Sequence, residues 1–177
     1  MGRLKPTDSR VVIESVEPCV DDGRFPVKRP LGDPVEVTAR VFADGHDSVS
    51  AVLRYRRRGR RSWAEIVMES RPNDKWRARF TPTELGDWEF EVAGWVDHFT
   101  TWREAMVKRV EAGADVSVEL MIGAELVSST AARCDDPDRK MLTDMAAVMG
   151  DGDSSPEIRL DVAFADDLAA LMSAHPD

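Results

Sequence analysis

Several features that mark common classes of protein are missing from this chain. Its 177 residues include only two cysteines, Cys19 and Cys134, and they lie far apart. Two separated cysteines cannot build the disulfide framework of a small secreted domain, and no CxxC pair is present for zinc. No apolar run approaches the ~18 residues that a membrane span needs, and residues 1–9 lack the apolar core of a signal peptide. We expect a soluble, cytoplasmic protein without a membrane partner.

Catalytic and cofactor-binding motifs are also absent. The three histidines, His46, His98 and His175, have no HxH or HExxH spacing, and no GxGxxG, Walker or GxSxG motif occurs. Carboxylates are plentiful over residues 135–167, but a glycosidase mechanism needs two of them across a sugar-binding cleft. We interpret these carboxylates as helix caps, loop residues and solvated helix faces. The sequence predicts no catalytic residue, no metal site and no cofactor.

Charged residues are distributed unevenly along the chain. Its net charge of −9 disfavours nucleic acid as a partner. Residues 1–113 contain 20 Lys and Arg against 19 Asp and Glu, whereas residues 114–177 contain 4 against 14. One basic cluster stands out around the Gly59 turn, at Arg54, Arg56, Arg57, Arg58, Arg60 and Arg61. Two interpretations stay open: a hairpin that binds phosphate or nucleic acid beside Tyr55 and Trp63, or a solvated edge hairpin.

Apolar and polar residues alternate before residue 97, as in strands buried on one face. Turn sequences such as Asp44-Gly45 and Arg58-Gly59 separate these runs. The predicted strands lie within residues 11–16, 35–41, 51–55, 63–68, 76–80 and 88–92, with room for a seventh. Short strands at this spacing predict an antiparallel β-sandwich of immunoglobulin-like size.

Helical periodicity replaces the alternation after residue 96. The pattern predicts a helix over 102–112, a second from 116, a third from Pro137 to 149 and a fourth over 164–172, with a polar loop at 151–156. The expected end signals are a capping box from Thr101 to Glu104, a left-handed Gly113, an Asp115 cap, and Asp136 capping a helix that begins at Pro137. The predicted fold class is α+β, with a disordered tail over 1–9, a β-sandwich over 10–98 and a small acidic helical bundle over 99–177.

Aromatic residues gather where the last strand meets the first helix. Trp95, Phe99 and Trp102 alternate there with polar residues. Such rings can stack on sugar faces, or they can pin a helix onto a sandwich. We name Lys28, Arg29, Trp95, Asp97, Phe99, Trp102 and Arg103 as candidates for a substrate rim or an interface.

Several separate motifs resemble one known family. They are RVVIE at 10–14, DGRFPVKR at 22–29, VFADGHD at 41–47, WVDHFTTWR at 95–103 and VEAG at 110–113. In this order they resemble the N-terminal region of bacterial α-1,4-glucan:maltose-1-phosphate maltosyltransferases, members of the α-amylase superfamily. The likeness covers residues 10–130 well, and residues 168–177 are similar to the end of the family's helical segment.

The resemblance implies a sandwich domain N with an inserted helical domain S, both preceding a (β/α)₈ barrel and helping to form a homodimer. The implied activity transfers maltosyl units from maltose 1-phosphate to a glycogen-like glucan, through an aspartate nucleophile and a glutamate acid/base on the barrel. No part of a barrel is present, so no catalytic residue is carried over. We expect a truncated fragment that stops inside the helical insert, lacks one sandwich strand and self-associates through the open edge.

Four functions follow as expectations. The first is a non-catalytic assembly module that forms a homodimer or contacts the catalytic barrel. The second is a carbohydrate-binding module that holds α-glucan through Trp95, Phe99 or Trp102. The third is an arginine hairpin that binds phosphate or nucleic acid, and the fourth is an enzyme in its own right. Within a complete enzyme, Lys28 and Arg29 could approach a sugar phosphate.

Overall fold

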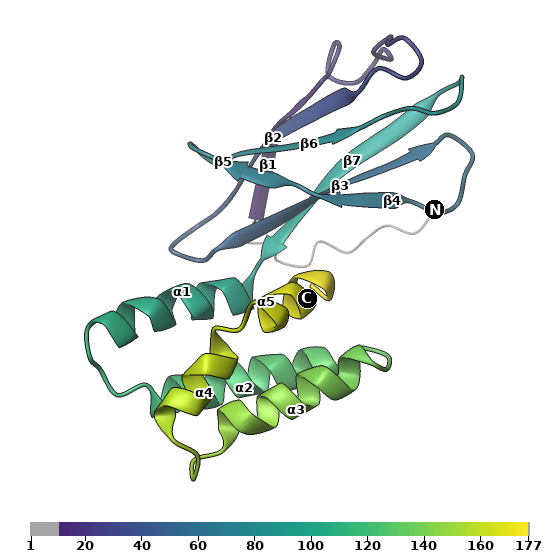
Figure 1. Cartoon of the computed structure of the whole chain (residues 1–177). Helices are drawn as coiled ribbons and strands as arrows, with labels where there is room; N and C mark the ends of the chain where they lie inside the picture. The colour runs from purple at the N-terminus through teal and green to yellow at the C-terminus, as the bar shows by residue number, and fades with distance from the viewer. Residues whose placement is uncertain (1–10, 177) are drawn as a thin grey trace. The chain divides into compact units, whose positions relative to one another are not determined.

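The chain forms seven strands followed by five helices, an α+β arrangement (Figure 1). The computed structural model describes residues 11–176, so the tail predicted over residues 1–9 lies outside the described residues. The chain divides into two compact units between Val96 and Asp97. We call their described parts the β unit, residues 11–96, and the helical unit, residues 97–176.

The β unit consists of two antiparallel sheets. One has the strand order β1-β2-β6-β5 and the other the order β4-β3-β7. The strands are β1 (Val11–Glu17), β2 (Val35–Ala43), β3 (Val49–Arg57), β4 (Ala64–Val67), β5 (Glu69–Arg71), β6 (Lys75–Phe80) and β7 (Trp88–Val96). Every run predicted from alternation contains a strand. The run at 63–68 contains β4 and ends at Met68, between the two sheets, and β5 follows outside the predicted runs.

Inward side chains of both sheets share one core. Val37 and Val41 of β2 meet Leu53 of β3, and all three are fully or nearly fully buried. An aromatic group joins them, with the rings of Tyr55 and Phe80 stacked at 4.6 Å between centroids. Burial of each such side chain contributes about 1.5–3 kcal/mol relative to exposure. The alternation in the sequence therefore identified the buried face of each sheet.

The β7 strand comes very close to the facing sheet at Gly94. A Cβ atom at this position would lie only 2.8 Å from Cγ1 of Val41 and 3.3 Å from Cγ1 of Val11. Carbon atoms need about 3.5–4.0 Å, so only glycine fits here without displacing its neighbours.

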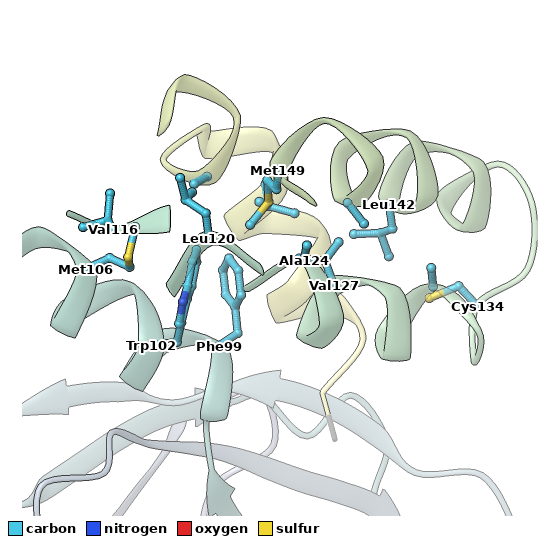
Figure 2. Close-up of a cluster of buried hydrophobic side chains, with 14 residues drawn as sticks. Phe99, Trp102, Met106, Val116, Leu120, Ala124, Val127, Cys134, Leu142 and Met149 are labelled. Carbon is cyan, nitrogen blue, oxygen red and sulfur yellow. The ribbon is translucent and has the colours of Figure 1, made fainter. Parts of the chain in front are cut away.

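The helical unit contains α1 (His98–Glu111), α2 (Ser117–Ala131), α3 (Asp138–Gly150), α4 (Pro156–Ala163) and α5 (Asp166–Ala174). Its core, shown in Figure 2, is built from residues of all five helices, including Met106, Leu120, Leu142, Ala163 and Leu168. The predicted α2 stripe is confirmed, because its four members at 116, 120, 124 and 127 are buried.

The first helix begins earlier than predicted. Asp97 is its N-cap, and its carboxylate accepts a hydrogen bond of 2.8 Å from the backbone N–H of Thr100. Thr101 lies inside the first turn and donates its hydroxyl to the carbonyl of Asp97. The capping box predicted at Thr101 is therefore wrong, because the aspartate four residues earlier supplies the cap.

The end of α1 is as predicted. Gly113 has a φ of +66°, and its N–H donates to the carbonyl of Val110. The N–H of Ala114 donates to the carbonyl of Arg109, which completes a Schellman motif.

Three other helix predictions need correction. The second helix begins at Ser117 with Val116 as its N-cap, so Asp115 lies one residue before the cap position. The third helix begins at Asp138, so Pro137 precedes the helix and Asp136 is not its cap. The predicted fourth helix corresponds to α5, which begins at Asp166, and a further helix, α4, occupies residues 156–163, where none was predicted. Ser155 followed by Pro156 is the N-cap and first-turn proline that could have revealed α4.

Candidate interaction surfaces

Two of the three candidate aromatic residues belong to the helical core. Phe99 and Trp102 are only 7% and 8% exposed, and their ring centroids lie 5.5 Å apart. The indole N–H of Trp102 donates to the carbonyl of Glu119 at 2.8 Å. Burial leaves these rings little surface for a sugar, so the structure favours packing over stacking on a ligand.

The third candidate ring, Trp95, belongs to the β unit. It is half-buried and pairs with Ser50 in the β3–β7 ladder. Inward side chains of β7, such as Phe90 and Val92, pack on the core, so the alternation places Trp95 on the outer face.

The polar candidates next to these rings hold the helical unit together. Asp97 caps α1. Arg103 donates from Nη2 to the carbonyl of Phe164 at 2.7 Å, and its guanidinium lies 6.0 Å from the centroid of that ring. These contacts account for both side chains as structural elements of the helical unit.

Lys28 and Arg29 lie in the loop that joins β1 to β2. Both are exposed, and Arg29 donates from Nη1 to the carbonyl of Lys28 at 3.3 Å. Among residues 11–176, no carboxylate lies within ion-pair distance of either cation. Their charges remain available to an anionic group.

The arginine hairpin is largely neutralised by carboxylates. Arg54 lies between Glu65, at 3.0 Å, and Glu91, at 2.7 Å. The ring of Trp63 stacks beside two guanidiniums, with its centroid 4.1 Å from Cζ of Arg56 and 5.4 Å from that of Arg54. Further ion pairs join Arg56 to Glu89, Arg57 to Glu84, Arg58 to Asp87 and Glu89, and Arg60 to Glu84. This pairing favours the solvated edge hairpin over a phosphate or nucleic-acid site.

The structure describes no constellation of titratable groups like those of an active site. Among residues 11–176, no group of three or more His, Cys, Asp or Glu side chains could hold a metal ion. The shifted pKa values belong to turns and ion pairs. For example, the Ser117 hydroxyl lowers the pKa of Asp115, and the Ser154 hydroxyl lowers the pKa of Asp151. Both shifts reflect local hydrogen bonds to a carboxylate near a helix end.

Sequence reasoning missed a buried arginine in the helical unit. Arg159 of α4 is only 4% exposed, and its Nε donates to the carbonyl of Met149 at 2.8 Å. This carbonyl belongs to the last turn of α3, where a cation is favourable. No local pattern marks Arg159, because its acceptor is ten residues away.

The most prominent apolar surface of the helical unit lies on α2. Val118, Met121 and Ile122 are 64%, 61% and 52% exposed. Because they are spaced i, i+3 and i+4, they lie on one side of the helix, opposite its buried stripe. We call these three residues the α2 patch. The sequence signal is a helix that is apolar on both sides, which is typical of a helix covered on both sides.

None of the described helices is long and apolar enough to cross a membrane.

Comparisons with known proteins place this geometry in a family. A family model described as "Alpha-1,4-glucan:maltose-1-phosphate maltosyltransferase, domain N/S" matches residues 9–177. The maltosyltransferase of Chlorobaculum tepidum is 42% identical over 175 residues, covering 98% of this chain and 26% of the relative. That of Myxococcus xanthus is 39% identical over 174 residues, with 94% and 26% covered. That of Rhodospirillum rubrum is 34% identical over 193 residues, with 98% and 27% covered. The chain thus spans about a quarter of the length of these relatives. It belongs to the α-1,4-glucan:maltose-1-phosphate maltosyltransferase family and corresponds to the N-terminal region, domain N/S, of its members.

Proposed function

We propose that this chain is a non-catalytic assembly module of a cytoplasmic maltosyltransferase that extends glycogen-like α-1,4-glucan from maltose 1-phosphate. The acid/base and nucleophile of that reaction would reside on a (β/α)₈ barrel, and this module would position the barrel or pair it with a second copy. The observation that carries the proposal is the α2 patch, because it leaves three large apolar side chains in water on a well-packed helix.

The energetics of the α2 patch suit an interface. Covering its exposed parts contributes roughly 1–2 kcal/mol per side chain, before the entropic cost of association. The side of α2 that bears the patch turns polar toward its C-terminal end, with Glu125, Ser128 and Ser129 exposed. An apolar centre with a polar margin is the usual composition of a protein interface.

We further propose that the β unit is an immunoglobulin-like sandwich with one edge open to a further strand. In immunoglobulin constant domains the strand orders are ABED and CFG. The order β1-β2-β6-β5 matches the first, and the adjacent β3 and β7 match C and F. The strand corresponding to G would pair with β7, which lies at the edge of its sheet. On this proposal the chain alone binds ANS and self-associates through β7, whereas monomeric two-state melting with little ANS binding contradicts it.

The assembly role is tested by sedimentation velocity of the chain, alone and mixed with a barrel-containing polypeptide of the same family. We expect association, and we expect Met121→Lys to weaken it at least tenfold. Ala147→Lys is the matched control, because it adds the same charge to an exposed helical position on α3, outside the patch and its polar margin. A wild-type chain that stays monomeric and ignores the barrel refutes the proposal. So does a Met121→Lys variant that associates like the control.

Catalytic inactivity has its own test. Incubation of the chain with maltose 1-phosphate and glycogen should release no phosphate, and release by the chain alone would contradict a purely structural role.

Glucan binding is a second candidate function. Of the three candidate rings, Phe99 and Trp102 are buried in the helical core, so this function would depend on Trp95, which is half-buried. Affinity electrophoresis in glycogen-containing gels tests it. Retardation that Trp95→Ala abolishes supports binding, and unchanged mobility of the wild-type chain removes it.

A further inference from the structure

The outer face of the β1-β2-β6-β5 sheet carries like charges side by side. Strand register places Arg40 of β2 opposite Lys75 of β6, and Arg71 of β5 opposite the same lysine. We call these three exposed residues the cation row. Neighbouring strands lie about 4.8 Å apart, so the row extends roughly 10 Å across the sheet. Like charges directly opposite each other destabilise a sheet, so this row costs stability when nothing anionic covers it.

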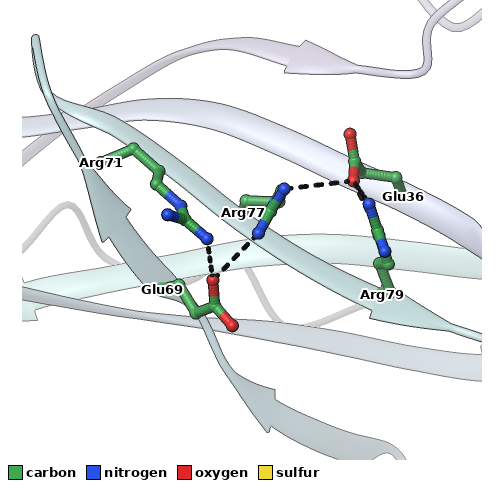
Figure 3. Close-up of polar contacts among 5 residues, drawn as sticks. All are labelled: Glu36, Glu69, Arg71, Arg77 and Arg79. Atoms are coloured by element: carbon green, nitrogen blue, oxygen red, sulfur yellow. Dashed lines mark hydrogen bonds and ion pairs between the residues drawn. The ribbon is translucent and has the colours of Figure 1, made fainter.

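The nearby carboxylates are shared among several arginines, one of which, Arg71, belongs to the cation row. As Figure 3 shows, Arg71, Glu69, Arg77, Glu36 and Arg79 follow one another across β5, β6 and β2. One oxygen of Glu69 serves both Arg71 and Arg77, and one oxygen of Glu36 serves both Arg77 and Arg79. Three guanidiniums thus face two carboxylates.

The other two members of the cation row, Arg40 and Lys75, receive little compensation. Glu14 lies 3.9 Å from Arg40, at the limit of an ion pair, and both side chains are about half exposed. Within the part of the chain that the structure describes, Lys75 has no carboxylate at ion-pair distance. By strand register this outer face has five cations, at 40, 71, 75, 77 and 79, against four carboxylates, at 14, 17, 36 and 69.

The helical unit carries the complementary charge. Residues 114–177 contain 14 Asp and Glu against 4 Lys and Arg. Glu157 and Asp161 lie four residues apart on α4, and Asp166 and Asp167 begin α5. All four are exposed, and no ion pair joins them to a cation among residues 11–176. Side chains four apart on a helix are about 5–6 Å apart, close to the strand spacing, so an acidic helix laid across the strands meets successive cations.

We propose that the cation row is a docking site for the acidic α4–α5 segment of a second copy of this chain. The inference rests on the proposed assembly function and names both partner surfaces of an electrostatic contact within it. In a two-fold pair the contact would form twice, once from each copy. Because both surfaces are exposed before docking, the contact should form rapidly at low salt and weaken steeply as salt screens it.

Lys75→Glu is the decisive variant. It converts the cation row into an alternating row, so the isolated chain should melt at a higher temperature while losing its docking site. In sedimentation velocity at 25 mM NaCl, we expect dimerisation at least tenfold weaker than wild type. Arg61→Glu is the matched control, since it makes the same change of charge at an exposed position outside this face. The higher melting temperature would show that lost association is not a folding defect.

A charge exchange identifies the partner surface. Asp161→Lys should also self-associate weakly, and mixing it with Lys75→Glu should restore pairing, because each mixed pair contains one contact of reversed polarity.

Three results would overturn the docking site. They are a wild-type chain that is monomeric at 25 mM NaCl, dimerisation unchanged between 25 and 500 mM NaCl, or a Lys75→Glu chain that dimerises like Arg61→Glu. Salt-insensitive dimerisation that Met121→Lys abolishes would leave the assembly role intact and remove only this site.

Discussion

Replacing Gly123 with alanine tests how the helical core is built. A Cβ atom at this position would lie 2.1 Å from Cζ2 and 2.5 Å from Cε2 of Trp102, where carbon atoms need about 3.5–4.0 Å. The indole cannot move freely, because its N–H is bonded to Glu119 and its ring lies against Phe99. Either α1 and α2 must separate or Trp102 must leave its site.

Three effects set the size of the expected loss of stability. Overpacking a core costs about 1–3 kcal/mol, and an overlap with rigid ring atoms belongs at the upper end. Loss of the Trp102 hydrogen bond costs about 1 kcal/mol more. Alanine recovers about 1 kcal/mol of helix propensity relative to glycine. We therefore expect the free energy of unfolding to fall by about 3 kcal/mol, which lowers Tm by about 12–24 °C for a unit of this size.

Urea unfolding of the full chain, followed by circular dichroism at 222 nm, measures this loss because the signal reports chiefly the helices. Gly150→Ala is the matched control. Its Cβ would lie 3.5 Å from the Cβ of Ala124, an ordinary contact, so this variant should be neutral or slightly stabilising. If Gly123→Ala unfolds at the same urea concentration as Gly150→Ala, the reasoning about the contact between Trp102 and α2 is refuted.

Three further predictions concern other parts of the chain. Gly94→Ala should lower the stability of the β unit by about 1–3 kcal/mol, because its Cβ would meet Val41 at 2.8 Å; thermal melting monitored by near-ultraviolet circular dichroism checks this. Gly113→Ala should cost about 1 kcal/mol through its φ of +66° alone, since no atom lies within 4 Å of the added Cβ; an unchanged urea midpoint would contradict the Schellman geometry. Hydrogen bonds from Arg77 and then Arg71 lower the pKa of Glu69 from 4.5, so its stabilising contribution is present above that pH and is lost as the pH falls through the folded value. A carboxyl NMR titration of Glu69 that gives a pKa at or above 4.5 would show that these contacts do not form in solution.

Local patterns in the sequence were sufficient for most of the elements and for their buried faces, but they did not reveal β5 or α4. Alternation identifies the inward residues of β2, such as Val37 and Val41, because successive side chains of a strand point to opposite faces. Gly113 marks the end of α1 because a left-handed residue there favours glycine. The family motifs likewise come from short runs, and the family model covers residues 9–177.

Some element boundaries could not be placed from local sequence signals, and tertiary structure decided them. Both Asp97 and Thr101 can cap a helix, and only the observed geometry selects Asp97. Similarly, the side chain of Met68 enters the core between β4 and β5, and the sequence did not show that the chain changes sheets there and continues as a further strand.

Charge pairing shows most clearly what tertiary structure added. The sequence shows that the hairpin arginines are numerous, but the partners of Arg54 are 11 and 37 residues away, on β4 and β7. The cation row likewise arises because strand register sets Arg40 beside Lys75. Periodicity in the sequence indicates which face of a strand a side chain occupies. The residue opposite it on the neighbouring strand depends on pairing between segments that are distant in the sequence. For that reason the sequence alone determined most of the elements, much of the core and the family, and the three-dimensional fold decided which charges are neutralised.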